Sequence, residues 1–268
     1  PTTFTINSAT LSDQVQSITN TGILFLDSDI DVSINDLAVE GFNTGIRSLR
    51  SGGNIMFTGQ TTITNPGESG IRIEGPAPGG GATFTFNDLD FALQRDNSTG
   101  LDLADAQFSA GNVGLFADDF DLTSTSSTGT VGVDLRNATG NGIVRLGAGN
   151  MTGGSSIAGV ATAIDQSAIT ALNFTFGDGG DTGDDGDEAS ALQATNIFGG
   201  STPVGGNYNF LDVGTITGST SNLSGSAPSV FFVDQNQNPG GNGQSVAQAG
   251  SIVNAAAASV DVIALIDT

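Results

Sequence analysis

The three residues Thr21-Gly22-Ile23 recur with small variations along the chain, as Thr44-Gly45-Ile46, Ser69-Gly70-Ile71, Thr99-Gly100-Leu101, Val131-Gly132-Val133 and, more weakly, Thr162-Ala163-Ile164. Successive glycines of this pattern are 23, 25, 30 and 32 residues apart. Repeats of about 20 to 50 residues are typical of solenoids, in which each repeat forms one coil that stacks on the next. The pattern therefore predicts a solenoid.

Alternating polar and apolar residues predict short strands within each repeat. Gly, Asn and Asp separate these strands, as the left-handed backbone positions of tight turns require. A sandwich or a barrel also has many short strands, but neither predicts the same Gly-Ile corner once per repeat. We therefore expect an all-β fold, a parallel β-helix. The expected strands cover residues 3–6, 23–26, 31–34, 54–57, 62–64, 71–73, 82–86, 89–91, 120–122, 131–135, 143–146, 172–176 and 230–233.

Both ends of a solenoid leave open sheet edges, which invite pairing with other chains unless they are covered. Leu11, Val15 and Ile18 recur at spacings of four and three residues, which predicts a short helix with one apolar face. We expect this helix to cap the N-terminal end. Residues 255–266 form an apolar tail, which is expected to cap the other end or to contact the next subunit.

Two stretches resemble coils of known proteins. They are Asn54-Ile55-Met56-Phe57-Thr58-Gly59-Gln60-Thr61-Thr62-Ile63 and Gly70-Ile71-Arg72-Ile73, and they are similar to coils of bacterial surface β-helices, including autotransporter passengers and large adhesins. The helix-then-strand opening from Leu11 to Leu26 resembles the N-terminal cap of these folds. The likeness covers most of residues 10–235 and implies a right-handed parallel β-helix with a short N-terminal capping helix. It implies a scaffold and not an activity, because such scaffolds carry many functions.

The whole chain, residues 1–268, is expected to form a single β-helix domain. Residues 1–20 would supply an N-terminal strand and the capping helix, and residues 21–176 the regular coils. Residues 177–190 form an acidic loop insertion, and residues 191–268 irregular coils and the C-terminal tail.

The composition excludes several classes of function. The 268 residues contain no Cys, His, Trp or Lys, and 28 acidic against 6 basic residues give a net charge of −22. Without Cys and His the chain has no disulfide framework, zinc finger, haem site or Ser–His–Asp triad. The negative charge argues against nucleic acid as a partner, and no apolar run approaches the ~18 residues of a membrane span. Many Thr, Ser, Asn, Asp and Gly, without thiols or amines, favour an extracellular or cell-surface location.

The acidic loop is the candidate metal site, because hard oxygen-ligand metals such as calcium suit this composition. It differs from an EF-hand loop in its spacing and lacks the tandem Gly-rich nonapeptides of calcium-binding β-rolls. The alternative is a solvated acidic turn that binds no metal. The residues that would converge their oxygens on calcium are Asp178, Asp181, Asp184, Asp185, Asp187 and Glu188.

Two further groups of acids are candidate sites. Asp27, Asp29 and Asp31 alternate, which predicts three carboxylates on one face of a strand that hold a cation or, more simply, face solvent. A second group is the candidate carboxylate cluster for glycoside hydrolysis. The pair Asp118-Asp119 resembles the paired aspartates of β-helical polygalacturonases, but their Gly-His-Gly and Arg-x-Lys motifs are missing. The second group consists of Asp118, Asp119, Asp121 and Asp134.

Two functions from different classes follow. The first is a non-catalytic extracellular structural protein, a self-associating subunit of a surface fibre, matrix or adhesive layer, joined end to end or by a strand lent to a neighbour. The alternative is a β-helix that binds or cleaves carbohydrate, with a surface polysaccharide as its partner. One Tyr and no Trp make a poor platform for sugar rings, so we expect the first function, with no catalytic residues and no cofactor other than calcium.

Overall fold

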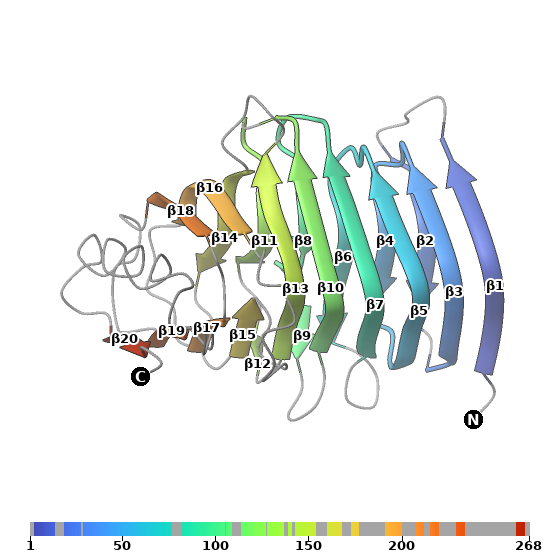
Figure 1. Ribbon diagram of the computed structural model, residues 1–268. Coiled ribbons are helices and arrows are strands. Elements are labelled where there is room, and N and C mark those ends of the chain that lie inside the picture. The colour runs from blue at the N-terminus through green and yellow to red at the C-terminus, as the bar shows by residue number, and fades with distance from the viewer. Residues whose placement is uncertain are drawn as a thin grey trace.

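The computed structural model describes residues 3–13, 19–27, 29–76, 82–104, 106–108, 114–126, 128–136, 139–140, 143–153, 160–167, 173–176, 191–199, 207–211, 215–219, 229–233 and 261–265. Over these residues the chain is an all-β parallel solenoid, which confirms the predicted parallel coil. Figure 1 shows its strands stacked from β1 at one end to β20 at the other.

Long strands form the first ladder of parallel pairings, which begins at β1 and ends at β20. The ladder narrows after β13, because the strands that follow are shorter. Its strands are β1 (Thr3–Ser12), β3 (Asp31–Glu40), β5 (Gly53–Thr64), β7 (Ala82–Leu93), β10 (Gly114–Ser124), β13 (Ile143–Gly153), β15 (Asn173–Phe176), β17 (Asn207–Leu211), β19 (Ser229–Val233) and β20 (Asp261–Leu265).

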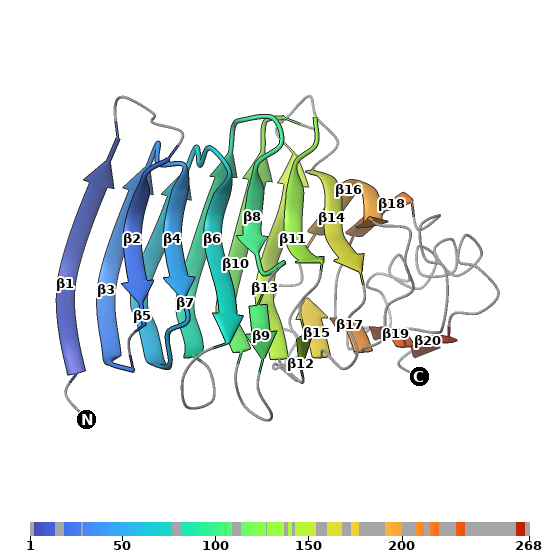
Figure 2. The same cartoon turned by 180° about the vertical axis from the view of Figure 1, so that it is seen from behind.

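The glycine repeat forms the second ladder, which Figure 2 shows from the opposite side. Each predicted Gly-Ile corner lies at the start of one of its strands. The turns β3–β4, β5–β6, β7–β8 and β10–β11 each have a neighbouring turn on both sides. The strands of this ladder are β2 (Thr21–Leu26), β4 (Thr44–Leu49), β6 (Ser69–Pro76), β8 (Thr99–Asp102), β11 (Val131–Arg136), β14 (Val160–Ser167), β16 (Ala191–Gly199) and β18 (Thr215–Ser219). The end of β6 also pairs with β9 (Ala106–Phe108), which pairs with β12 (Thr139–Gly140).

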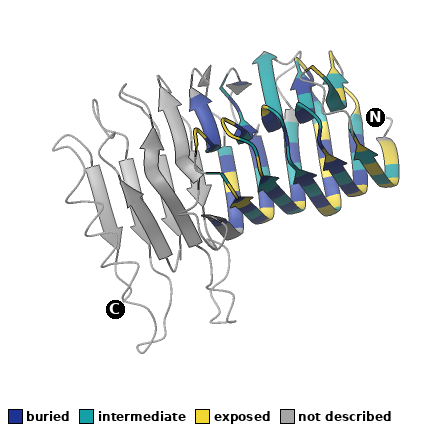
Figure 3. Cartoon of the chain, turned by 90° about the horizontal axis from the view of Figure 1, so that it is seen from above, coloured by how far each residue is buried: buried dark blue, intermediate teal, exposed yellow. Residues whose placement is uncertain are grey.

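Strands β3, β5, β7 and β10 change the phase of their alternation near the middle. In β3, Asn35 and Asp36 are both exposed, although buried residues alternate on either side of them. Two consecutive outward residues mark the place where the strand bends from one face of the solenoid to the next. The apolar stretches before and after the bend therefore belong to one continuous hydrogen-bonded strand. In β10, Asp118 and Asp119 occupy the same kind of position. Figure 3 shows the resulting bands of buried and exposed residues.

Phenylalanine and aliphatic side chains fill the interior in register from turn to turn. Phe57 and Phe86, on neighbouring strands, stack with their ring centroids 4.3 Å apart and their planes at 6°. Phe91 and Phe120 pack at 5.9 Å in the other half of the long strands. Because the register is parallel, each inward residue lies on the inward residue of the next turn, and one continuous core results.

The repeated glycines let the short strands approach the long strands closely. A Cβ on Gly70 would lie 2.3 Å from the Phe91 ring and 2.8 Å from the carbonyl oxygen of Gly100. A Cβ on Gly100 would meet Leu122 at 2.5 Å. These distances are far below normal carbon contacts, so the packing of the two ladders explains the glycine in the repeat.

The predicted N-terminal helix is not confirmed, because the described residues contain no helix and Leu11 and Ser12, where it was expected to begin, belong to β1. Leu11 pairs with Val39 of β3 and packs against the core, so tertiary pairing overrides its helical spacing. Val15 and Ile18 lie outside the described residues. The Ile23–Leu26 strand is confirmed as part of β2, but Leu24 and Leu26 are not buried, at 51% and 49% exposure.

Candidate functional site

The N-terminal end of the solenoid is the candidate functional site. Among the described strands, β1 pairs with β3 and β2 pairs with β4, and neither has a partner on its other side. Such an edge presents a row of backbone N–H and C=O groups to any further strand.

Side-chain exposure rises steeply towards this end. Phe4, Val32, Ile55 and Phe84 occupy one register column on successive long strands. Phe84 and Ile55 are 1% exposed, Val32 is 8% exposed and Phe4 is 58% exposed. A phenylalanine in an inward column is therefore left half in solvent, because no further turn lies on it.

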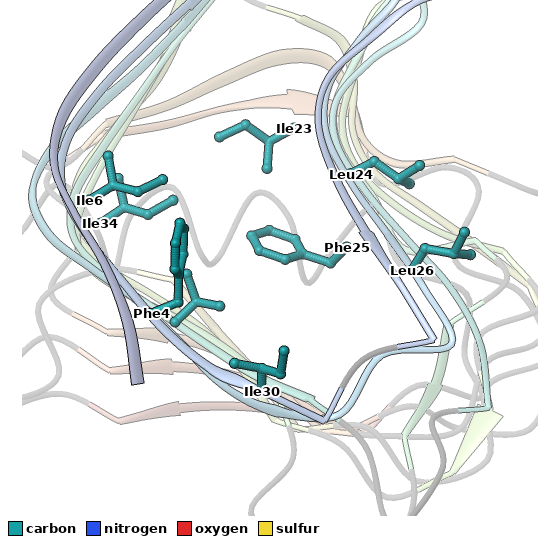
Figure 4. Close-up of a pocket in the computed structure, with 9 residues that line it drawn as sticks. Phe4, Ile6, Ile23, Leu24, Phe25, Leu26, Ile30 and Ile34 are labelled. Carbon is teal, nitrogen blue, oxygen red and sulfur yellow. The ribbon is translucent and has the colours of Figure 1, made fainter. Parts of the chain in front are cut away.

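The end of the core opens into an apolar cavity of about 390 Å³. Figure 4 shows Phe4 and Ile6 of β1 facing Ile23 and Phe25 of β2 across this cavity, whereas Leu24 and Leu26 point away from it. Ile30, 51% exposed, closes one side. We refer to the exposed residues Phe4, Leu24, Leu26 and Ile30 as the N-terminal apolar face.

The edge strands of this face carry no charge. Neither Thr3–Ser12 nor Thr21–Leu26 contains an acidic or basic residue, although the chain as a whole has 28 acids. At the margin, the guanidinium of Arg50 donates two hydrogen bonds to the Asp27 carboxylate, at 2.7 and 2.8 Å. The hydrogen bond from Arg50 lowers the pKa of Asp27. A second sheet edge could therefore pair with β1 and β2 without burying a charged side chain of either strand.

A different group of acids lies on two neighbouring long strands, at the bend and just beyond it. Asp88 and Asp90 of β7 are in register with Asp119 and Asp121 of β10. Burial raises the pKa of Asp88, and the charge of Asp121 adds to this effect. Burial also raises the pKa of Asp90, with further contributions from the neighbouring acids, although Gln60 donates a 2.8 Å hydrogen bond to its carboxylate. These four residues, the acid rows, are therefore held close together by the register.

The second ladder carries an ionic network on its outer side. Arg72 of β6 contacts Glu68 at 2.8 Å, Glu74 at 3.0 Å and Asp102 of β8 at 3.5 Å. Burial lowers the pKa of Arg72, but these three carboxylates outweigh it and raise the pKa above its usual value. Arg47 of β4 contacts Glu74 from the other side at 2.6 Å. Arg47 and Arg72 thus neutralise acids on neighbouring turns, as a structural pairing does.

The structure separates the acids of both secondary predictions. Asp27 ends a turn with a left-handed φ of 47°, and β3 begins only at Asp31, so Asp27, Asp29 and Asp31 do not lie along one strand. Asp134 is 2% exposed and pairs with Asp102 in the second ladder, away from Asp118, Asp119 and Asp121 of β10. The predicted cluster of four therefore spans two ladders, because proximity in sequence does not fix the strand on which a residue falls.

The predicted calcium ligands, Asp178, Asp181, Asp184, Asp185, Asp187 and Glu188, all lie outside the described residues. Within the part of the chain that the structure describes, no three acids are grouped so that they could hold a metal ion.

The sequence did not indicate that the N-terminal apolar face is exposed, since a helix was expected to cover it. The available signal was the strand Thr3–Ser12 itself, which precedes the first glycine repeat and has neither charge, Pro nor Gly to protect its edge.

Comparison with known proteins yields no match: no protein-family model, no curated protein and no solved structure is similar to this chain. In the described residues no helix has the length and apolar character needed to cross a membrane.

Proposed function

We propose that this chain is a non-catalytic extracellular structural protein that associates with itself to build a surface fibre, matrix or adhesive layer. The observation that carries the proposal is the N-terminal apolar face, where the inward residue Phe4 remains 58% exposed beside the outer edges of β1 and β2, with which no described strand pairs. Contiguous exposed apolar surface next to an open sheet edge is a feature of protein interaction sites.

Composition supports the non-catalytic part of the proposal. Cys, His and Lys, three side chains that serve as nucleophile or general base in many enzymes, do not occur in the sequence. The cluster that the sequence predicted for hydrolysis is divided between the two ladders, with Asp134 apart from Asp119. The extracellular location and the right-handed path of the coil are further parts of the proposal, and they rest on composition and on the resemblance to bacterial surface β-helices.

Calcium is part of this proposal through the acidic loop of residues 177–190. Its carboxylates and glycines suit an ion that takes six to eight oxygen ligands. Divalent cations and salt would also screen a chain of charge −22, which otherwise repels its own copies.

A second candidate is a β-helix that binds or cleaves carbohydrate. The observation in its favour is the acid rows, where the pKa values of Asp88 and Asp90 are raised, as in a carboxyl group that donates a proton to a glycosidic oxygen. Release of reducing ends from acidic polysaccharides, abolished by Asp119→Ala, would support this function over the structural one.

Sedimentation velocity of the full chain over a range of concentrations tests self-association. We expect larger species as concentration and ionic strength rise, and Phe4→Glu, at the open end of the core, should reduce them. Met56→Glu adds the same charge at an exposed position of β5, at 44% exposure, away from the N-terminal face, and should leave association unchanged. A wild-type chain that stays monomeric at all concentrations, with and without calcium, would overturn the proposal.

A further inference from the structure

The first and last described strands are the two ends of one unbroken ladder. Pairings connect β1, β3, β5, β7, β10, β13, β15, β17, β19 and β20 in turn, and each pairing is parallel. Figure 1 shows β1 and β20 at opposite ends of the molecule. All these strands run in the same direction, so β1 and β20 turn opposite hydrogen-bonding edges away from the ladder, and no described strand pairs with either edge.

Two register columns carry apolar or aromatic residues from one end of this ladder to the other. The column of Phe4 reaches Val262, and the column of Ile6 reaches Ala264. The first column is Phe4, Val32, Ile55, Phe84, Leu115, Val144, Phe174, Tyr208, Val230 and Val262. The second column is Ile6, Ile34, Phe57, Phe86, Ala117, Leu146, Phe176, Phe210, Phe232 and Ala264.

We infer that copies of this chain join head to tail, with β1 of one copy pairing in parallel with β20 of the next and Phe4 at the register position that follows Val262. The inference rests on the proposed self-association and adds the direction in which neighbouring copies are joined. In this arrangement the ladder crosses the boundary between copies as it crosses each boundary between turns. The register column of Phe4 in one copy then continues the column that ends at Val262 in the next.

Charge and shape both favour a second copy over other occupants. In the continued register, Asp261 is the one charged residue of β20 and meets the uncharged Thr3 of β1, so no two acids face each other. A head-to-head contact would instead place β1 antiparallel to another β1. The five residues of β20 would pair with Thr3–Asn7, the half of β1 before its change of phase, whereas an antiparallel β1 would pass through that change in the opposite direction.

A head-to-tail contact does not close on itself unless its rotation happens to form a ring, so it produces an open filament. A head-to-head contact uses the same surface on both copies and stops at a dimer. The size distribution therefore separates the two arrangements.

The decisive experiment uses Phe4→Glu in the full chain as a chain terminator. This variant has a blocked β1 end and an intact β20 end, and it should fold because Phe4 is 58% exposed. Mixed with wild type at one part in ten, it should add to the free β1 end of a filament and stop growth there. We expect a several-fold decrease in the mean length of the wild-type filaments, with Met56→Glu at the same dose causing none.

A complementary pair of variants tests the same contact without wild type. Val262→Glu, with Ile263→Glu as a second version, blocks the β20 end. Neither Phe4→Glu nor the β20 variant should assemble alone, and an equimolar mixture should form a one-to-one dimer. A Val262→Glu variant that self-associates while Phe4→Glu does not, or terminator doses that leave filament length unchanged, would overturn the head-to-tail contact and leave the proposed self-association intact. A wild-type chain that never associates would overturn both.

Discussion

Replacing Gly70 by alanine tests the packing that the glycine repeat makes possible. The new Cβ would lie 2.3 Å from Cε1 and 2.7 Å from Cδ1 of Phe91, and 2.8 Å from the carbonyl oxygen of Gly100. Carbon atoms pack at about 3.5–4.0 Å, so the ring would have to withdraw by about 1 Å. Phe91 is 2% exposed and packs against Phe120, and the carbonyl belongs to the neighbouring strand β8, so neither has room to move.

Overpacking of this kind costs about 1–3 kcal/mol. Alanine also lowers the conformational entropy of the unfolded chain, which offsets about 0.4–1 kcal/mol of this loss of stability. We therefore expect Gly70→Ala to lower the free energy of unfolding by about 1–2 kcal/mol, measured by urea unfolding followed by circular dichroism with an unchanged m value.

A double-mutant cycle locates the cause of this loss. Phe91→Leu removes the ring atoms that Cβ would strike, so Gly70→Ala should be less destabilising in that background, with a coupling of about 0.5–3 kcal/mol. If Gly70→Ala is neutral or stabilising, or if the two substitutions are additive, then close packing is not the reason for glycine in the repeat.

Three further outcomes are expected. Phe57→Ala should lower the free energy of unfolding by about 3–5 kcal/mol, since Phe57 is 0% exposed and stacked on Phe86. Met56→Ala, at the neighbouring outward position, should change the free energy of unfolding by no more than about 0.5 kcal/mol. Similar losses for both variants would contradict the assigned core. Asp90→Asn should stabilise the chain at pH 7, because burial raises the pKa of Asp90 in the folded chain and the ionised carboxylate therefore destabilises the fold. The gain should vanish as the pH falls below about 3.9, the ordinary pKa of Asp, where the carboxyl group is protonated in both states. Urea unfolding from pH 3 to 7 measures this, and an equal effect of the exposed Asp29→Asn would argue against it. Isothermal titration of the full chain with millimolar calcium should give a heat of binding. The double variant Asp181→Asn and Asp184→Asn should lose this heat, and the control Asp29→Asn should keep it. No heat from the wild-type chain would exclude calcium from the acidic loop.

The solenoid could be predicted from sequence because two of its constraints are local. Glycine recurs where the short strands approach Phe91 and Leu122, and inward residues alternate with outward residues along each strand. Both constraints leave a pattern in a single chain. The Gly-Ile corners therefore predicted the starts of the second-ladder strands.

The continuity of the long strands could not be predicted in the same way. Residues 82–86 and 89–91 suggested two strands, but the structure has one, β7, which passes through Asn87 and Asp88. Two outward residues in succession interrupt the alternation without interrupting the hydrogen bonds. The bend is therefore visible only once β7 is paired with β5 and β10.

The candidate site depends on contacts that a single sequence does not contain. The spacing of Leu11 suggested a helix over the N-terminal end, but pairing with Val39 holds Leu11 in β1. Exposure of Phe4 follows from its place on the terminal strand, because the same residue type at Phe84 is buried by a strand on each side. The apolar type of Phe4 predicts burial in both cases.

Self-association through the ends of the solenoid is the central claim, and negative-stain electron microscopy of the purified full chain tests it most directly. Images taken with calcium and again after chelation should show filaments one solenoid wide. Their shortening on chelation would assign calcium a part in the assembly. Single short rods under both conditions, at the concentrations where sedimentation is measured, would contradict the structural role and favour a monomeric binding protein.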